Sequence, residues 1–370
     1  MKINELQMYL KLLATPGVGN AIALKLLTHF KSIEAIFNAP KDKIIAIPQI
    51  GLLVYTNLHK PINDKQQKYI DEELEYVSKN NIAVVSILDD EYPEYLRFCY
   101  DPPILLFTQG HINLKNKRII SVIGTRNLTK HGAQFCESLL ADLKPYDPVI
   151  VSGFAYGTDI LAHITAANLK LQTIAVLPNG LKQIYPKEHE KYIDKICLNG
   201  GLITEFWSSR YIDKENFVKR NRIVAGMSSA TVLIESAEKG GSLITTNYAN
   251  DYNRDVYAVP GRVGDKYSVG CNQLIKENKA QILTDANDII KGLNWDLQES
   301  VSKTIQTQLF VELNDRELLL ANYLKLNGKT FTDVIAAELG FTLSETSGIL
   351  LNLELKGVIK NLPGRFYELI

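Results

Sequence analysis

Apolar residues recur with three different spacings along this chain, and each spacing predicts a different kind of structure. Over roughly the first 75 residues they recur every three or four positions, as in helices that bury one face. From about residue 80 they form short β-branched runs that alternate with helical stretches. Helical spacing then returns near the end of the sequence. We therefore predict three folded units, at 1–75, 80–292 and 313–370, with a linker over 293–312.

The first unit is predicted to contain amphipathic helices over "ELQMYLKLL" (5–13) and "NAIALKLLTHF" (20–30). Two short Pro/Gly turns interrupt the helical pattern, "TPGVG" (15–19) and "IPQIG" (47–51). A helix, such a turn and a second helix are typical of a helix-hairpin-helix, whose backbone N–H groups hold a phosphate. They are equally typical of a tight turn in a small helical bundle, and the sequence leaves both interpretations open.

The second unit is predicted to be an α/β fold with a doubly wound, mostly parallel sheet. Its strands are nearly continuous apolar runs, which indicates burial on both faces. Eight runs have this character: "IAVVSIL", "RIISVIG", "PVIVSG", "QTIAVLP", "GLITEF", "ATVLIE", "DVYAVP" and "QILT". Ligands of such sheets bind at the carboxyl ends of the strands, so candidate functional residues are sought in the loops that follow them.

The third unit is predicted to be a winged helix. Helices begin after Asn314 and after Thr342, each followed three residues later by a glutamate, which is the pattern of a capping box. Between them another helix ends at Gly340, and a hairpin turns at Pro363-Gly364. Three helices followed by a hairpin are the order of elements in that fold.

The third helix of this unit is a poor candidate for reading a duplex. A helix that reads the major groove carries Arg, Lys, Asn or Gln. This helix offers Asn352 and Lys356, against Glu345 and Glu354. The composition favours a structural or protein-contacting role.

Composition narrows the classes of function. Lys+Arg and Asp+Glu are both 41, which argues against a protein coated with positive charge but leaves room for a local basic groove. The four cysteines are far apart, and no CxxC or HExxH occurs, so we expect reduced cysteines and no metal site. No signal peptide and no apolar stretch of membrane-spanning length is recognised, which predicts a soluble, cytoplasmic protein.

The strand run at 118–124 ends in a turn that is suited to anions. Gly124 lets the chain turn sharply, and Thr125 with the amides that follow can bond an anion. Arg126 is then placed to clamp a phosphate with two parallel hydrogen bonds. The alternative is an arginine that pairs with a surface carboxylate.

Small residues dominate the loop after the next strand, "VSGFAYGTDILAH". Ser152 and Gly153 allow another backbone or a ligand to come close. The loop is not the dinucleotide fingerprint GxGxxG, which argues against a dinucleotide-dependent dehydrogenase. Asp159 and His163 are four positions apart in the helix that follows, so they form either a proton-transfer pair or, as is commoner, a helix cap with its i,i+4 partner.

The stretch "RYIDKENFVKRNRIVAG" concentrates positive charge in an otherwise neutral chain. Between residues 210 and 222 it holds five basic and two acidic residues, with Phe217 among them. Single-stranded nucleic acids need basic side chains for phosphates and rings on which bases stack. The alternative is a solvated amphipathic helix with Phe217 in the core.

Two further loops that follow predicted strands are candidates for ligand binding. Gly240-Gly241-Ser242 precedes a helix whose first turn offers bare amides to an anion. Tyr185, after another strand, is either a wall of a crevice or ordinary packing. If all these loops meet at one edge of the sheet, that edge suits the successive phosphates of a polynucleotide better than one small ligand.

Six of these stretches occur in the order and spacing of the DprA/Smf family, the DNA-processing proteins of natural transformation. They are "GTRNLTKHG", "SGFAYGTDILAH", "AVLPNGLKQIYP", "FVKRNRIVAG", "ESAEKGGSLITT" and "AVPGRVGDKYSVGCNQLI". The resemblance implies a helical N-terminal domain, a Rossmann-like core and a winged helix. It further implies a protein that is not an enzyme, needs no cofactor, binds single-stranded DNA, loads the RecA recombinase and forms a homodimer through its core.

The resemblance also implies roles for particular residues. Thr125 and Arg126 clamp a phosphate, Lys214 meets another phosphate, and Phe217 contacts a base. The full set of residues that the resemblance assigns to single-stranded DNA is Gly124, Thr125, Arg126, Ser152, Gly153, Lys214, Phe217, Arg220, Asn221, Arg222, Gly241 and Thr245.

The alternative function is that of an enzyme, a nucleotide phosphoribohydrolase of the lysine-decarboxylase-like type. "KGGSLITTNYAND" echoes the glycines of its PGGxGTxxE motif. The stretch lacks the proline, the GT pair and the glutamate of that motif. Without that carboxylate we find no general acid or base for cleavage of an N-glycosidic bond.

Overall fold

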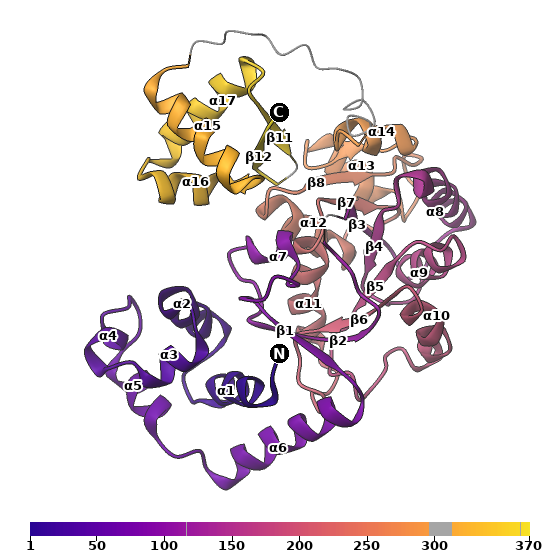
Figure 1. The fold of residues 1–370 in the computed structure, drawn as a ribbon. Coiled ribbons are helices and arrows are strands. Elements are labelled where there is room, and N and C mark those ends of the chain that lie inside the picture. The colour runs from indigo at the N-terminus through magenta and orange to yellow at the C-terminus, as the bar shows by residue number, and fades with distance from the viewer. Residues whose placement is uncertain (116, 296–312, 363) are drawn as a thin grey trace.

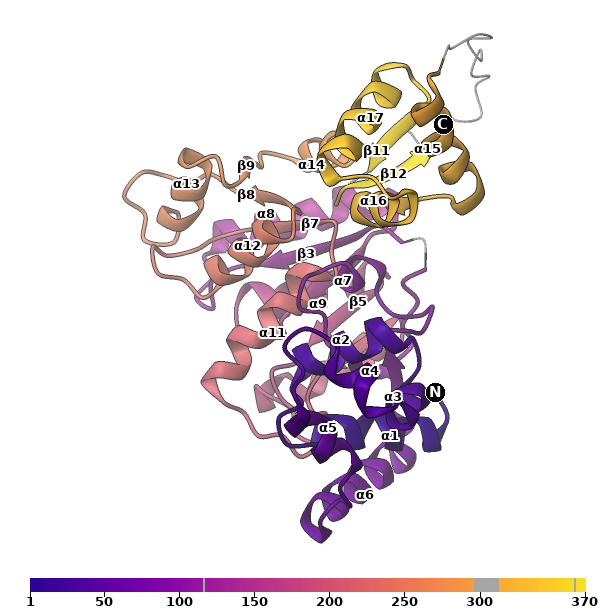
Figure 2. The same cartoon turned by 90° about the vertical axis from the view of Figure 1, so that its left-hand side faces the viewer.

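The computed structural model describes residues 1–115, 117–295, 313–362 and 364–370. A large central sheet carries a helical unit and a small winged-helix unit, which lie at opposite ends of it in both views (Figures 1 and 2).

Within the described ranges, no single helix is long and apolar enough to cross a membrane. Helices α16 (Thr332–Leu339) and α17 (Leu343–Leu355) meet that length and composition only when taken together, and they are bent by 112° relative to each other.

The N-terminal unit contains α1 (Ile3–Ala14), α2 (Asn20–Phe30), α3 (Ile33–Asn38), α4 (Lys41–Ile45), α5 (Leu52–His59) and α6 (Asp64–Lys79). Helix α2 has the predicted bounds. The turn between α1 and α2 needs Gly17, whose φ of 83° is unfavourable for other residues. The Glu73 carboxylate on α6 accepts hydrogen bonds from the backbone N and the Oγ of Ser208, at 2.8 and 2.6 Å, and so joins this unit to the core.

The core is built on a nine-stranded sheet with the order β1-β2-β6-β5-β4-β3-β7-β8-β9. Strands β3 to β9 run parallel, whereas β2 lies antiparallel to both β1 and β6. The strands are β1 (Ala83–Ser86), β2 (Leu105–Gly110), β3 (Ile119–Ile123), β4 (Val149–Ser152), β5 (Thr173–Val176), β6 (Gly200–Thr204), β7 (Ala230–Leu233), β8 (Asp255–Ala258) and β9 (Gln281–Ile282).

All eight predicted strand runs contain a strand, but the pattern does not predict β2. Its three buried apolar residues follow Pro102-Pro103 and lead into the polar Thr108 and Gln109, so neither alternation nor a long apolar run marks it. The parallel strands are apolar on both faces, as expected. On β3, Ile120 and Val122 join one buried cluster, whereas Ile119 and Ile123 join the other.

Helices cover both faces of this sheet. Those of the core are α7 (Glu94–Arg97), α8 (Lys130–Leu143), α9 (Thr158–Asn168), α10 (Ile193–Cys197), α11 (Lys214–Gly226), α12 (Ser242–Asp251), α13 (Val269–Lys276) and α14 (Ala286–Gly292), with short 3-10 turns η1 (Lys144–Tyr146) and η2 (Lys187–Tyr192). Buried residues of α8, α9 and α14 share one cluster, and those of α11, α12 and α13 share the other.

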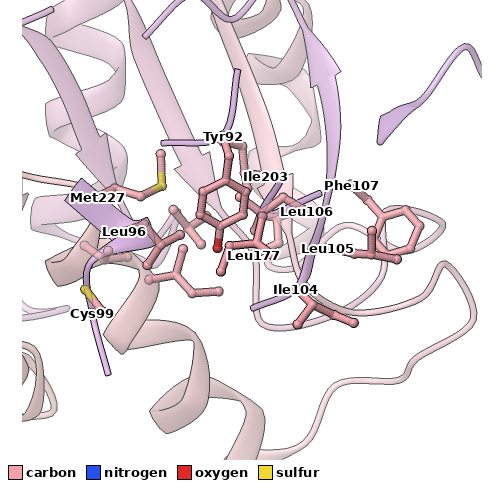
Figure 3. Close-up of a cluster of buried hydrophobic side chains, with 14 of the residues drawn as sticks. Tyr92, Leu96, Cys99, Ile104, Leu105, Leu106, Phe107, Leu177, Ile203 and Met227 are labelled. Atoms are coloured by element: carbon pink, nitrogen blue, oxygen red, sulfur yellow. The ribbon is translucent and has the colours of Figure 1, made fainter. Parts of the chain in front are cut away.

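A buried cluster anchors the carboxyl end of α11, whose other end borders the site described below. Tyr92 and Leu96, from the segment around α7, pack with Ile203 of β6 and with Met227, which follows α11 directly (Figure 3). The Tyr92 hydroxyl donates to the backbone O of Pro103 at 2.7 Å. Burying one such large apolar side chain contributes about 1.5–3 kcal/mol to stability, so the cluster holds α11 firmly.

The winged-helix unit contains α15 (Asp315–Asn327), β10 (Thr330–Phe331), α16, α17, β11 (Ile359–Leu362) and β12 (Phe366–Leu369). Asn314 and Thr342 form the two predicted capping boxes. The unit rests on α7: Phe331 stacks on Phe98 with ring centroids 4.9 Å apart, and Lys329 pairs with Glu94 at 3.1 Å. The expected linker at 293–312 falls outside the described residues from 296 onward.

Candidate nucleic-acid interface

A hollow of about 270 Å³ opens at the carboxyl ends of β3, β4 and β7. The chain leaves β3 toward β4 on one side and later returns to place β7 on the other. This is the point at which the strand order reverses, where doubly wound sheets bind ligands. Nine of the predicted residues line the hollow: Gly124, Thr125, Arg126, Gly153, Phe217, Arg220, Asn221, Gly241 and Thr245.

The loop after β3 is held rigidly by backbone hydrogen bonds. The N–H of Thr125 donates to the backbone O of Glu235 at 2.8 Å, and the N–H and Oγ1 of Thr158 both donate to the backbone O of Thr125 at 3.2 Å. The Glu235 carboxylate also accepts from the N–H and Oγ1 of Thr129, at 3.0 and 2.5 Å. Glu235 therefore fills the amino end of α8 itself, and that helix end is not open to a phosphate.

Arg126 leaves this loop with an exposed side chain. Its guanidinium lies over the Phe217 ring, 5.5 Å from the centroid. None of the ion pairs among the described residues involves Arg126. The alternative interpretation, an arginine paired with a surface carboxylate, is not what the structure shows. An unneutralised guanidinium with several N–H donors is instead poised beside the hollow.

Phe217 is half-buried at the rim of the hollow and is not a core residue. Its ring meets the ring of Tyr185 edge to face, with centroids 5.8 Å apart. Between Arg126 and Tyr185, the ring is held while part of it faces solvent. The structure therefore supports the interpretation of Phe217 as a ring available for stacking, and not the alternative that it is buried in the core.

Arg220 lies beneath the hollow and is only 3% exposed. Its guanidinium donates to the backbone O atoms of Gly153 and Val176, at the ends of β4 and β5. Burial lowers the pKa of Arg220 to about 10, an effect that Asp159 opposes, and burial also raises the pKa of Asp159. A Cβ at Gly153 would lie 2.6 Å from the guanidinium, which explains the glycine. Asn221 accepts from Nε of Arg220 at 3.1 Å.

The expected pairing of Asp159 with His163 is wrong. The Asp159 carboxylate accepts from the N–H of Ala155 at 3.3 Å and does not cap α9. Nδ1 of His163 lies 2.7 Å from Oγ1 of Thr173. Burial lowers the pKa of His163 to about 3, so the ring is neutral at physiological pH, and its Nδ1 is engaged with Thr173 and not with Asp159.

Three of the predicted residues do not line the hollow. The Oγ of Ser152 is buried and donates to the backbone O of Val122 at 2.6 Å. Lys214 is exposed at the first position of α11. Arg222 is 8% exposed and pairs with the carboxylates of Glu205 and Asp101. The two arginines of the RNR motif therefore lie in different environments: Arg220 lines the hollow, and Arg222 is paired with carboxylates away from it.

The amino end of α12 forms the remaining wall. Gly240, Gly241 and Ser242 line the hollow together with Thr245, one turn along the helix. The first turn of α12 carries no acidic side chain. Its backbone N–H groups and the positive end of the helix dipole therefore add to the positive potential that Arg126 provides.

Three family models match separate parts of the chain. That of DNA recombination-mediator protein A matches residues 83–294, that of the DprA winged helix domain residues 330–365, and that of a SAM-like helix-hairpin-helix tandem residues 9–52. The last match confirms the helix-hairpin-helix interpretation of the N-terminal turns, and the second confirms the winged helix.

Curated relatives resemble the chain over most of its length. Protein Smf of Synechocystis is 28% identical over 384 residues and covers 95% of this chain and 96% of its own. Protein Smf of Escherichia coli is 30% identical and covers 82% of both chains. DNA processing protein DprA of Streptococcus pneumoniae is 38% identical over 205 residues, which are 55% of this chain and 72% of its own.

Two solved structures share the fold. That of DprA from Streptococcus pneumoniae superposes with a TM-score of 0.64 at 31% identity, covering 79% of this chain and 98% of its own. That of DNA processing protein A from Helicobacter pylori has a TM-score of 0.53 at 29% identity, covering 59% and 98%. The Helicobacter pylori protein is described as having a distinctive mode of binding single-stranded DNA.

Proposed function

The chain belongs to the family of DNA recombination-mediator protein A, and on that premise we propose that it binds single-stranded DNA across the hollow between β3, β4 and β7. Members of this family are DNA-processing proteins and not enzymes, as the sequence resemblance implied. The observation that carries the proposal is the guanidinium of Arg126, which forms no ion pair with a described residue and lies against the partly exposed ring of Phe217.

The chemistry of these two side chains fits an unpaired strand. Arg126 and the amino end of α12 meet phosphates, while the face of Phe217 accepts a base. A duplex offers phosphates too, but its bases are stacked within the helix and closed to such a ring. Arg220 holds the ends of β4 and β5 from below, and Arg222 holds Glu205 and Asp101, so both act as positioning residues.

Fluorescence anisotropy with labelled oligo-dT, and with a duplex of equal length, tests the binding. We expect the single strand to bind more tightly and its affinity to fall steeply with salt, as counterions are released from the phosphates. Equal affinity for strand and duplex, or an affinity that salt does not change, contradicts the proposal.

The family also supports a role in recombination. We propose that the bound strand is handed to the RecA recombinase during natural transformation, and that the protein acts as a homodimer joined through its core. The rate at which RecA assembles on single-stranded DNA, with and without the protein, tests the transfer. An unchanged assembly rate contradicts that step and leaves the binding of DNA standing.

We propose that the winged-helix unit does not read duplex sequence. Three leucines are exposed on α17, namely Leu343, Leu351 and Leu355, and the helix carries no arginine or lysine within its bounds. The unit is attached to the core through the stacked rings of Phe98 and Phe331. Sequence-dependent binding of duplexes that is lost in an Asn352→Ala variant would refute this assignment.

A further inference from the structure

Aromatic side chains continue beyond the hollow on the side of Arg126. Tyr156 lies in the loop between β4 and α9 and is 39% exposed. The next residue, Gly157, has a φ of 75° and sits so close to the loop after β3 that a Cβ would lie 2.6 Å from the backbone O of Arg126. Tyr156 is therefore a direct neighbour of the Arg126 loop, although the two are 30 residues apart in sequence.

The ring of Tyr156 is held in place from two sides. Its hydroxyl donates to the Glu188 carboxylate at 2.8 Å, and its ring meets the His189 ring edge to face, with centroids 4.9 Å apart. His189 is itself fixed, with Nδ1 2.9 Å from the backbone O of Phe154. An exposed ring that is already immobilised costs little conformational entropy when a base stacks on it.

Tyr185 connects Tyr156 with the hollow. The Tyr185 ring contacts the Phe217 ring edge to face at 5.8 Å. The pKa of Tyr156 is raised chiefly by its hydrogen bond to Glu188 and also by Tyr185, whereas Arg126 lowers it, so both groups lie within electrostatic reach of its hydroxyl. Phe217 on α11 thus contacts both the Arg126 guanidinium and the Tyr185 ring, while Tyr156 lies on the loop that packs against the Arg126 loop.

We propose that Tyr156 and Tyr185 form a second stacking platform, which carries the bases of a single strand onward from Phe217. This inference rests on the proposed binding of single-stranded DNA and adds the direction in which the strand leaves the hollow. Stacking on a ring is tolerant of sequence because every base has a π-face. Lys187, exposed at the start of η2, provides a positive charge for a phosphate on this path.

The platform predicts a dependence on the length of the strand. A short oligo-dT of about four nucleotides fills the hollow alone, whereas one of about twelve also reaches Tyr156. For Tyr156→Ala we expect an unchanged dissociation constant for the short strand and a roughly 5- to 150-fold weaker one for the long strand, the equivalent of about 1–3 kcal/mol for one stacked base.

Two further variants separate stacking from folding. Tyr156→Phe keeps the ring and its packing on His189 but loses the hydrogen bond to Glu188, so it should bind the long strand nearly as tightly as the wild type and much more tightly than Tyr156→Ala. Tyr100→Ala removes a more exposed tyrosine, 65% exposed beside Tyr252 and not part of the hollow, and should change neither affinity. Circular dichroism confirms that each variant is folded.

Four outcomes would contradict the platform. Equal loss for both strand lengths in Tyr156→Ala, or equal loss in the Phe and Ala variants, assigns Tyr156 a structural role and overturns the platform. A wild-type affinity that does not increase from the short to the long strand overturns it as well. If the wild-type protein binds neither strand, the proposed function itself fails and takes this inference with it.

Discussion

The guanidinium of Arg126 lies 5.5 Å from the centroid of the Phe217 ring. One residue belongs to the loop after β3 and the other to α11, and the two meet because β3 lies in the interior of the sheet, between β4 and β7, with α11 packed across one face. A cation over a ring is worth about 0.5–1 kcal/mol at an exposed site. That energy orients the arginine, and its N–H groups remain available to a phosphate.

Removing the charge should weaken binding without unfolding the protein. We expect Arg126→Ala to weaken binding to oligo-dT by roughly 1–3 kcal/mol, because a charged hydrogen bond to a phosphate is lost. Its thermal unfolding should match that of the wild type, since the side chain is exposed and no ion pair with a described residue is broken. Arg316→Ala, which removes an exposed arginine of the winged-helix unit, is the control. An unchanged dissociation constant removes Arg126 from the site.

Removing Phe217 and removing Arg126 should have different effects on the salt dependence of DNA binding. Phe217→Ala should weaken binding by roughly 1–3 kcal/mol through lost stacking but leave the slope of affinity against salt unchanged. Arg126→Ala should reduce that slope by about 0.7, the contribution of one phosphate contact on a single strand. Phe217→Trp keeps a stacking surface and should retain most of the affinity. A changed slope in Phe217→Ala contradicts the assignment of this ring to a base.

Arg220 should matter for folding more than for contact with DNA. We expect Arg220→Met to lower the free energy of unfolding of the core by roughly 3–5 kcal/mol, because two strand-end carbonyls and the buried Asp159 lose their partner. Adding Asp159→Asn should restore part of that loss by removing the unpaired charge. Urea unfolding measures both. Wild-type stability in Arg220→Met refutes the positioning role.

The stability that Glu73 contributes at the contact between the helical unit and the core should depend on pH. Burial raises the pKa of Glu73, although its hydrogen bonds from Ser208 oppose the shift. Stability from this group is therefore fully present below the pKa of an unfolded glutamate, about 4.3, and is lost as pH rises through the higher folded value. Relative to the wild type, Glu73→Gln should thus become more stable as pH rises from about 4.5 to 7.

The matched control for this pH dependence is Glu72→Gln, one residue away on the exposed side of α6, where the side chain is 57% exposed. Its difference from the wild type should stay constant over the same range of pH. Thermal unfolding at several pH values measures both variants. A constant difference in Glu73→Gln as well would show that burial does not shift this carboxyl group.

Local sequence was sufficient to predict most of the helices and strands. The capping boxes at Asn314 and Thr342 involve residues three positions apart, and the parallel strands are apolar on both faces, so neither depends on distant contacts. Because parallel strands end at one edge of a sheet, the loops after them were also predictable as candidate ligand sites. Strand β2 was not predictable, because its apolar run is short and becomes a strand through antiparallel pairing with β1 and β6, which the local sequence does not show.

Pairings between distant side chains were decided by the three-dimensional arrangement. Arg220 and Arg222 are two residues apart in one motif, yet one lies under the hollow and the other is paired with Glu205, because they leave α11 on different sides. Spacing of four suggested that His163 pairs with Asp159, but β5 brings Thr173 closer. Periodicity along a chain records which face of an element is buried; which residue it meets there depends on the order of the strands and the packing of helices on them.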